Sequence, residues 1–360
     1  MPTTAEPAKR SDVPFTWAAS CGMPAFATLA GVRFDRLFTD VEAIVAAYTK
    51  GRPMAEALFG PDVAMGGPTW VGISYGHINT LGARLVFPED SEVGHVPVYR
   101  SLREGISALQ RETDFIGEGL FPFYLELWEK LKQAFPDDRI PFGDFKSQGP
   151  VTTAWLLRGH DFFMDSLDDA SATRAYLELV TASIIRFNRL VRRINGQPEF
   201  SEKGMGMVDD GAAMIGPDQW PDMVLPFLER YYQGQTCGRR SAHIEDLKVG
   251  HLKYLDQLGL SSYDPSVSPK LTPELIRDHC AVPFLWRLNS THYVGRSLEA
   301  VEEWVFEAAA GGASGVFTVV AREMCDEGNA GKVRAFVRAA RRVKELLDGG
   351  CPRAELALRR

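Results

Sequence analysis

The feature that most constrains this chain is a regular alternation of short strand-like and helix-like segments from about residue 140 onward. Strands are predicted at 140–145, 204–208, 237–243, 260–263, 282–288 and 315–321, and each is followed by a predicted helix. Such alternation is typical of α/β folds with parallel sheets. Because one unit takes roughly 30 residues, eight units make the ~250 residues of a (β/α)8 TIM barrel. We therefore expect that barrel, with a doubly wound open sheet as the alternative.

The spacing of apolar residues supports the predicted helices near the C-terminus. Steps of three and four connect Val333, Phe336, Ala340, Val343 and Leu347 in one segment and Leu298, Val301, Val305 and Ala308 in another. Each set forms one apolar stripe that can pack on a sheet. We expect residues 1–95 to form an N-terminal helical extension with the first barrel elements, 96–348 the remainder of a single barrel, and 349–360 a tail.

Composition and charge exclude several classes of partner. The 360 residues carry a formal net charge of −7, and 45% of them are apolar, as in ordinary globular proteins. A net negative chain is a poor ligand for a nucleic-acid backbone or an anionic membrane. Five cysteines without a CxxC pair indicate a reduced protein, so we expect a soluble, cytoplasmic chain that binds neither nucleic acid nor membrane.

Polar residues that follow predicted strands form the candidate site. They are Asp209, Asp210, His243, Glu245, Asn289 and Cys325. In a TIM barrel the loops after the strands carry the chemistry. His243 and Glu245 are two residues apart and should project from the same face of a strand. If Cys325 joins them, an imidazole, a carboxylate and a thiolate would hold Zn²⁺ with its fourth position open, as in catalytic zinc sites.

Each of these residues also has a purely structural explanation. A His-x-Glu pair on a strand is more often half-buried and locally hydrogen-bonded than bound to metal, and a single cysteine is often a small core residue. Asp209 and Asp210 could cap a helix, or one of them could be a general acid or support a zinc ligand. The shared position of these residues at the ends of predicted strands makes a metal site more credible than any one of them does alone.

Three further residues, together with Asn289, are candidates for catalysis or substrate binding. His77 is either a catalytic pocket residue or a loop histidine bonded to the backbone. Tyr75 and Trp155 are candidate walls of a substrate site, although core packing explains such aromatic residues equally well. Asn289 is a candidate substrate-binding residue because it follows a predicted strand. A nucleotide P-loop and a complete dinucleotide-binding glycine loop are absent from the sequence.

From Gly149 to about Leu347 the chain resembles the uroporphyrinogen decarboxylase superfamily, and within it the cobalamin-linked methyltransferase branch. The stretches that carry the resemblance are Gly149–Gly159, Asp209–Pro217, Arg287–Asn289 with Gly295–Glu302, and Cys325 with Asn329. They occur in the family's order and at matching spacing. In that branch zinc is held by a His-x-Cys pair and a later Cys, so the resemblance implies zinc at His243 and Cys325, with Glu245 in place of the first cysteine.

The resemblance implies transfer of a methyl group from a small methoxylated substrate, an aryl methyl ether in our interpretation, to the cobalt of a corrinoid (cobalamin). The chain lacks the family's corrinoid-anchoring motif Asp-x-His-x-x-Gly, so the corrinoid would be carried by a partner protein. A carboxylate is a harder ligand than a thiolate, and Glu245 therefore favours an ether or alcohol as methyl donor. Asp210 would give a proton to the leaving oxygen or orient His243.

Three alternatives remain open. The same ligands would serve a methyltransferase that loads a thiol from a methylated corrinoid or folate. A uroporphyrinogen decarboxylase-like enzyme would need several arginines in its cleft, and the family's N-terminal Arg-Gln-Ala-Gly-Arg segment has no counterpart here. The third alternative is a non-catalytic barrel that binds a small ligand.

Overall fold

The computed structural model describes residues 9–89 and 91–358, so the outermost parts of the predicted extension and tail lie outside the described residues. The strands are β1 (Thr16–Cys21), β2 (Ala64–Met65), β3 (Arg84–Val86), β4 (Gly94–Val96), β5 (Gly204–Val208), β6 (Arg239–His243), β7 (Ser262–Asp264), β8 (Leu285–Arg287) and β9 (Gly315–Val320). The first helices are α1 (Met23–Leu29), α2 (Val41–Ala46), α3 (Arg52–Phe59), α4 (Gly76–Thr80), α5 (Leu102–Leu109), α6 (Phe121–Ala134), α7 (Pro150–Arg158) and α8 (Asp161–Asp168). The others are α9 (Ala170–Ile194), α10 (Trp220–Met223), α11 (Leu225–Gln233), α12 (Val249–Gln257), α13 (Pro273–His279), α14 (Ser290–Val294), α15 (Leu298–Ala310) and α16 (Glu327–Asp348).

The larger sheets are parallel, as the alternation of strands and helices predicts. One has the strand order β2-β1-β9-β8 and another the order β5-β6-β7. A parallel bridge between Tyr263 of β7 and Phe284, just before β8, connects them. The hairpin β3-β4 is antiparallel. The protein is therefore an α/β protein whose parallel strands end at a common edge.

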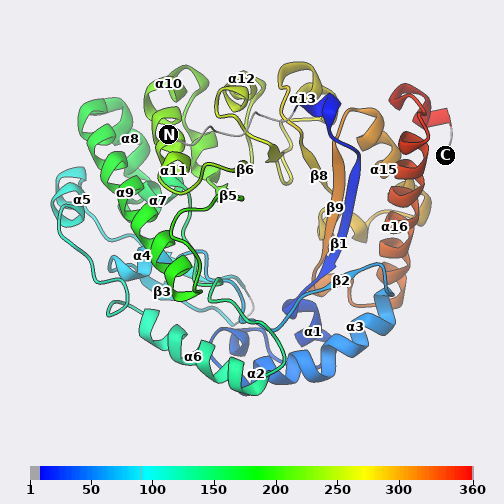
Figure 1. The fold of residues 1–360 in the computed structure, drawn as a ribbon, viewed down its shortest axis with the longest axis horizontal. Helices are drawn as coiled ribbons and strands as arrows, with labels where there is room; N and C mark the ends of the chain where they lie inside the picture. The colour runs from blue at the N-terminus through cyan, green and yellow to red at the C-terminus, as the bar shows by residue number, and fades with distance from the viewer. Residues whose placement is uncertain (1–8, 90, 359–360) are drawn as a thin grey trace.

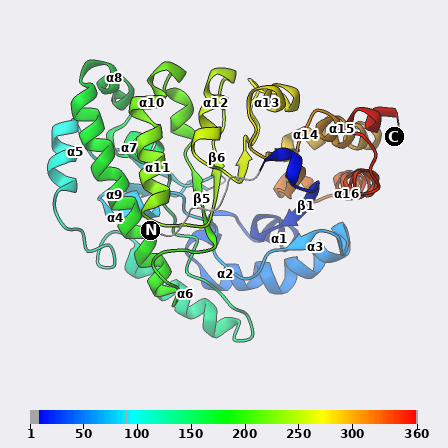
Figure 2. The same cartoon turned by 45° about the horizontal axis from the view of Figure 1, so that its top comes forward.

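Helices surround these strands. In Figures 1 and 2 the helices α10, α12 and α13 lie on one side of the strands, and α1, α2, α3 and α6 lie on the opposite side. The helices α15 and α16 lie near the C-terminus. In the described parts of the chain, no helix combines the length and the apolar character that crossing a bilayer requires.

Several helix boundaries agree with the sequence patterns and have clear physical causes. Thr272 precedes α13, and its side chain accepts a hydrogen bond from Leu275 N–H, with Pro273 as the first helical residue. The predicted stripe of α16 is buried at Val333, Phe336 and Val343. One member of the α15 stripe differs, because Leu298 lies in the first turn and is 42% exposed.

The strand predicted at 140–145 is reduced to a single parallel bridge between Ile73 and Phe145. The reason is a competing side chain. Asn195 Oδ1 accepts from Phe142 N–H (2.8 Å), and Asn195 Nδ2 donates to Phe142 O (2.7 Å). These bonds satisfy the backbone groups of Phe142 that a longer ladder would have used.

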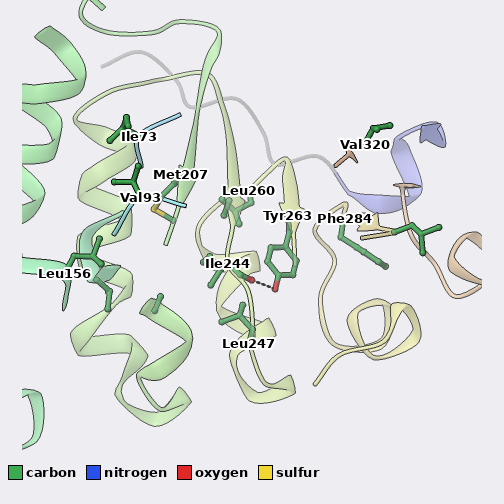
Figure 3. Packing of buried hydrophobic residues seen from close by; sticks show 14 of the residues in the cluster. Ile73, Val93, Leu156, Met207, Ile244, Leu247, Leu260, Tyr263, Phe284 and Val320 are labelled. Atoms are coloured by element: carbon green, nitrogen blue, oxygen red, sulfur yellow. Dashed lines mark hydrogen bonds between the residues drawn. The ribbon is translucent and has the colours of Figure 1, made fainter. Parts of the chain in front are cut away.

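Buried apolar residues fill the space between the strands and the surrounding helices. Figure 3 shows Ile244, Leu247 and Tyr263 packed together where β6 and β7 end. The Tyr263 hydroxyl donates to Ile244 O (3.0 Å), which ties the loop after β6 to β7. This packing holds the segment between His243 and Leu247 in place.

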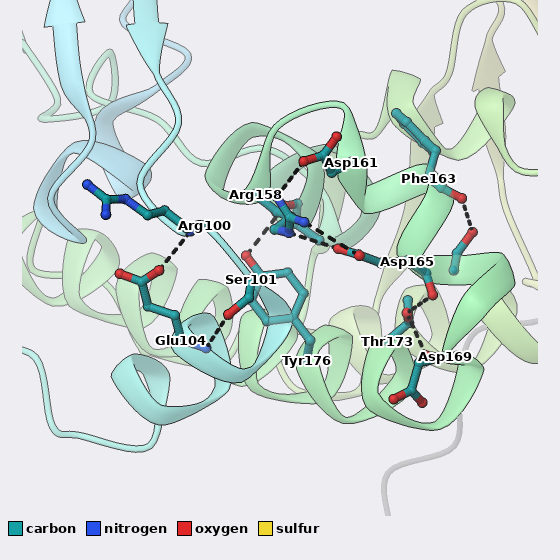
Figure 4. Close-up of polar contacts among 12 residues, drawn as sticks. Arg100, Ser101, Glu104, Arg158, Asp161, Phe163, Asp165, Asp169, Thr173 and Tyr176 are labelled. Atoms are coloured by element: carbon teal, nitrogen blue, oxygen red, sulfur yellow. Dashed lines mark hydrogen bonds and ion pairs between the residues drawn. The ribbon is translucent and has the colours of Figure 1, made fainter.

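Helix α7 is fixed by polar contacts as well as by burial (Figure 4). Arg158 at its C-terminal end is 10% exposed and pairs with Asp165 (2.8 Å) and Asp161 (3.1 Å) of α8. The Tyr176 hydroxyl of α9 donates to Ala154 O (3.4 Å). The position of α7 matters because its N-terminus contacts the candidate site.

Candidate functional site

The register of β5, β6 and β7 brings polar side chains from consecutive strands to one edge. Val208 is paired with His243, and His243 with Asp264. In parallel strands, paired residues stand side by side. Asp210, which follows β5, and Glu245, which follows β6, therefore lie near His243.

His243 lies between three carboxylates. Its Nδ1 is 2.8 Å from Asp264 Oδ2, and its Nε2 is 3.6 Å from Glu245 Oε1 and 3.8 Å from Asp210 Oδ1. Burial disfavours the imidazolium, but hydrogen bonds with Asp264 and Glu245 and the charges of Asp264 and Asp210 raise the pKa of His243 to about 10. Since Nδ1 is engaged by Asp264, Nε2 is the nitrogen that faces the other two carboxylates.

Asp210 and Glu245 are coupled through the backbone. Asp210 Oδ1 accepts a hydrogen bond from Glu245 N–H (2.8 Å), and both side chains are 42% exposed. The pKa of Glu245 is lowered chiefly by its hydrogen bond with His243, with Arg287 contributing through its charge. Burial raises the pKa of Asp210, against the Glu245 N–H bond and the charge of His243. The site therefore has partly solvated oxygen acceptors beside one imidazole nitrogen.

The loops that follow β6 and β7 contain unusual backbone conformations. In the part of the chain that the structure describes, the non-glycine residues with positive φ are Asp246 (62°) and Ser266 (50°). Asp246 comes three residues after His243, and Ser266 comes two residues after Asp264. Left-handed conformations cost energy for such residues and are concentrated at functional sites.

Asp209 and Asp210 have different partners, which the sequence could not decide. Asp209 is fully buried and accepts hydrogen bonds from Thr152 N–H (2.6 Å) and Val151 N–H (3.2 Å), at the N-terminus of α7. It therefore caps α7 from the position directly after β5. Asp210 faces His243 instead. The structure thus brings Asp210, and not the Asp209 carboxylate, to the side of the imidazole.

Cys325 follows a 3-10 turn, Arg322–Met324, after β9. Its Sγ lies 3.7 Å from both Ala25 O and Ala321 O, and burial is the main cause that raises its pKa to about 11. Within residues 9–89 and 91–358, no three His, Cys, Asp or Glu side chains form a group that could hold a metal ion. His243 and Glu245 are neighbours, whereas Cys325 lies apart from them.

His77 lies in an aromatic core. It is fully buried on α4, with its ring centroid 5.8 Å from that of Phe115 and 5.2 Å from that of Phe187, and its Nε2 is hydrogen-bonded to Ser183 Oγ (2.9 Å). Burial, with a contribution from the charge of Arg186, lowers the pKa of His77 to about 3. These contacts explain it as a neutral packing residue, and its catalytic role stays a prediction.

The low pKa of His77 should make the protein more sensitive to acid. The unfolded chain binds the His77 proton below about pH 6.5, whereas the folded chain does so only near pH 3, so stability falls as the pH falls between these values. We expect a loss of about 3 kcal/mol between pH 7 and pH 4 that is absent from His77→Gln. Urea unfolding at several pH values measures it, and equal slopes for both proteins would contradict the prediction.

The remaining predicted residues are dispersed. Asn289 caps α14, since its Oδ1 accepts from Thr291 N–H (3.1 Å). Trp155 lies on α7 with its ring near His160, at a centroid distance of 5.5 Å. Tyr75 is half-buried beside a cavity, with its ring centroid 4.8 Å from that of His95. Substrate binding by these three residues stays a prediction.

Sequence reasoning missed Asp264, the carboxylate nearest to His243. Asp264 directly follows the predicted strand at 260–263 and is the last residue of β7, so the rule that functional residues follow strands should have selected it. Arg287, at the end of β8, was overlooked in favour of Asn289 although its charge acts on Glu245. Both residues carried the same signal, which is a charged side chain at the end of a strand.

Comparison with known proteins gives a fold but no family. No family model matches the sequence, and no curated protein matches it. Among solved structures, the chain is similar to a methyltransferase from Methanosarcina mazei with a TM-score of 0.64 and 14% sequence identity, over 92% of this chain and 94% of that chain. At this identity, the match establishes that the two chains share a fold.

Proposed function

We propose that this protein is a zinc-dependent methyltransferase that moves a methyl group from an aryl methyl ether to the cobalt of a corrinoid on a separate protein. The observation that carries the proposal is the arrangement of His243 between Asp264, Glu245 and Asp210 at the ends of β5, β6 and β7. A fold shared with a methyltransferase over nearly the whole chain supports it.

We infer that the parallel sheets belong to one eight-stranded barrel. The pairings β2-β1, β1-β9, β9-β8, β7-β6 and β6-β5 are parallel, and Tyr263 bridges to Phe284 between the two sheets. On the other side Ile73 bridges in parallel to Phe145, and Gly149 N–H bonds to Val208 O (2.6 Å). These contacts link the seven strands and the segments at Phe145 and Ile73 in succession, and a barrel with its mouth at the strand ends is the simplest closure.

The donor atoms around His243 suit a metal ion in part. Ligands that share a tetrahedral zinc are about 3.3–3.6 Å apart, and Nε2 of His243 is 3.6 Å from Oε1 of Glu245. A carboxylate behind the other ring nitrogen, as Asp264 provides, is typical of zinc-binding histidines. Cys325 would complete the set only if the segment 321–326 moved toward the mouth. Zinc held there would polarise the ether oxygen and make it a better leaving group.

The chain's own residues would prepare this step. Asp264 would hold the His243 ring and its tautomer, so that Nε2 is directed toward Glu245 and is available to bind zinc. Asp210 would fix the start of the loop after β6 through Glu245 N–H and donate a proton to the departing oxygen. Because Glu245 supplies oxygen in place of sulfur, the site would favour an oxygen leaving group over a thiol acceptor.

Replacing Cys325 by alanine tests the proposed ligand set. We expect Cys325→Ala to lose zinc at equilibrium against a chelator and to lose methyl transfer to reduced cobalamin by a factor of about 100 or more. Removing zinc from the wild-type protein should have the same effect on methyl transfer, and adding it back should restore activity.

The matched control is Cys351→Ala, since Cys351 is also half-buried but lies after α16, close to Pro352. It should keep both zinc and activity. Full zinc content and full methyl transfer in Cys325→Ala would remove Cys325 from the proposal. A thiol methylated faster than the ether is demethylated would favour the alternative thiol methyltransferase.

A further inference from the structure

Arg287, the last residue of β8, points away from the surrounding helices. Trp286, the residue before it, lines a groove between α13 and α15 together with Pro273 and Trp304, so Trp286 faces the helices. Successive side chains of a strand point to opposite faces of its sheet. Arg287 therefore lies on the face of the sheet that is turned away from the helices, which we call the inner face.

The His243 site lies on the inner face as well. Arg240, three residues before His243 in β6, pairs with Glu229 of helix α11 (2.6 Å), so the alternation turns His243 inward. The charge of Arg287 contributes to the lowered pKa of Glu245, so these two groups are close, although no ion pair joins them in the described part of the chain. Arg287 is therefore a cation beside the proposed zinc ligand.

The guanidinium of Arg287 lacks a hydrogen-bond partner that its burial requires. Its Nε is shielded from solvent and has no partner among residues 9–89 and 91–358. Phe317, which pairs with Arg287 across the ladder between β8 and β9, has its ring centroid 6.0 Å from Cζ of Arg287. That contact uses the face of the guanidinium and leaves its N–H groups available. Buried polar groups are normally hydrogen-bonded, so a ligand that accepts from Arg287 would explain the exception.

The inner face has room for such a ligand. Bulky branched side chains usually fill the interior of a TIM barrel in layers. Here the paired residues Gly206 and Ser241, and Gly204 at the start of β5, present little or no side chain to the inner face. Val208 and Val319 are 39% and 37% exposed, although they belong to strands that helices surround. The protein's own side chains therefore leave part of this face open.

The charges around Arg287 favour a carboxylate as the ligand group. A guanidinium forms two parallel N–H bonds with a carboxylate or a phosphate. Three carboxylates, those of Asp210, Glu245 and Asp264, already surround His243 at the same edge. They repel a phosphate dianion more strongly than a group with a single negative charge. A singly charged carboxylate is therefore the anion that suits this position best.

We propose that Arg287 binds a carboxylate group of the ligand that occupies the inner face, so that the site prefers methoxybenzoates to uncharged aryl methyl ethers. Two N–H groups of the guanidinium would hold the carboxylate, and the half-buried ring of Phe317 would pack against the ring of the ligand. That this ligand is the methyl donor rests on the proposed function. That Arg287 selects an aromatic carboxylate does not.

Calorimetric titration of the purified full chain, without corrinoid, tests the selectivity. The ligands are 2-, 3- and 4-methoxybenzoate and the corresponding methoxybenzamides, which keep the shape of the ligand and remove its charge. We expect the best carboxylate to bind at least about tenfold more tightly than its amide, because it forms charge-assisted bonds with Arg287. If no isomer bound more tightly than its amide, the proposal would be overturned without the need for any variant.

Variants of Arg287 assign the preference to this side chain. Arg287→Met should abolish the preference and leave the affinity for the amide within about twofold, whereas Arg287→Lys should keep part of it, because lysine retains the charge without the planar fork. Arg239→Met is the matched control. Arg239 is exposed on the inner face at the start of β6, about 13 Å along the strand from His243, which exceeds the screening length of about 8 Å at physiological salt.

Arg239→Met should bind all six ligands as the wild-type chain does. A preference that persists in Arg287→Met, or that Arg239→Met loses to the same extent, overturns the proposal. Activity separates it from the proposed function. A carboxylate preference that depends on Arg287, without methyl transfer from any of these ethers, would contradict the proposed function alone. Methyl transfer to reduced cobalamin with equal kcat/KM for the methoxybenzoates and the methoxybenzamides would contradict the role of Arg287 alone.

Discussion

His243→Ala is expected to lower methyl transfer to reduced cobalamin by a factor of about 1,000 or more. This residue alone contacts three carboxylates of the site, and in our proposal it supplies a zinc ligand that no neighbour can replace. Loss of a metal ligand or of a positioned acid–base group typically costs factors of this size. The rate of methylcobalamin formation at saturating methyl ether, followed by absorbance, measures the effect.

Two further variants separate chemistry from folding in this experiment. His279→Ala changes an exposed histidine at the end of α13 and should keep full activity. Asp264→Asn removes the carboxylate that orients Nδ1 of His243, so we expect zinc affinity about 10–100-fold weaker, with activity recovered at high zinc. A His243→Ala protein that is folded and as active as His279→Ala would contradict the site.

Gly149→Ala is expected to destabilise the fold by about 3 kcal/mol or more. A Cβ at this position would lie 2.5 Å from Cγ of Asp209 and even closer to its Cβ, where no methyl group fits. Asp209 would have to move, and the hydrogen bonds from Val151 N–H and Thr152 N–H would be lost from a buried carboxylate. Urea unfolding of the purified variant gives the free energy of unfolding directly.

Gly143→Ala is the matched control, because its Cβ would have nothing within 4 Å. It should unfold within about 0.5 kcal/mol of the wild-type protein. If Gly149→Ala were as stable as Gly143→Ala, the contact between the start of α7 and Asp209 would be incorrect. The resemblance noted in the sequence begins at this Gly-Pro pair, and the close approach of Asp209 gives the glycine a physical reason.

Much of the architecture could be predicted because it depends on local patterns. β5 has the predicted bounds, and α13 begins at its Thr-Pro signal, since period and capping are properties of neighbouring residues. The reduction of the predicted strand at 140–145 to a single bridge could not be predicted, because Asn195, distant in the sequence, bonds to the backbone groups of Phe142. Long-range competition of this kind leaves no local pattern.

The sequence predicted that the candidate site lies at the ends of the strands, but it did not predict which way the individual side chains face. Two adjacent aspartates necessarily face different ways, yet only the position of α7 decides that Asp209 caps it and that Asp210 faces His243. Cys325 comes after a 3-10 turn that directs its sulfur toward Ala25 O. A turn of three residues changes direction without a strong sequence signal, so the convergence of Cys325 with His243 and Glu245 could only be hypothesised.

The most direct test of the central claim is methyl transfer by the zinc-loaded, full-length protein from 2-methoxyphenol to reduced cobalamin under anaerobic conditions. Our account predicts that methylcobalamin and catechol, the demethylated product, form in equal amounts. It also predicts that a chelator stops the reaction. Formation of neither product by folded, zinc-loaded protein, when a range of aryl methyl ethers is supplied, would contradict it.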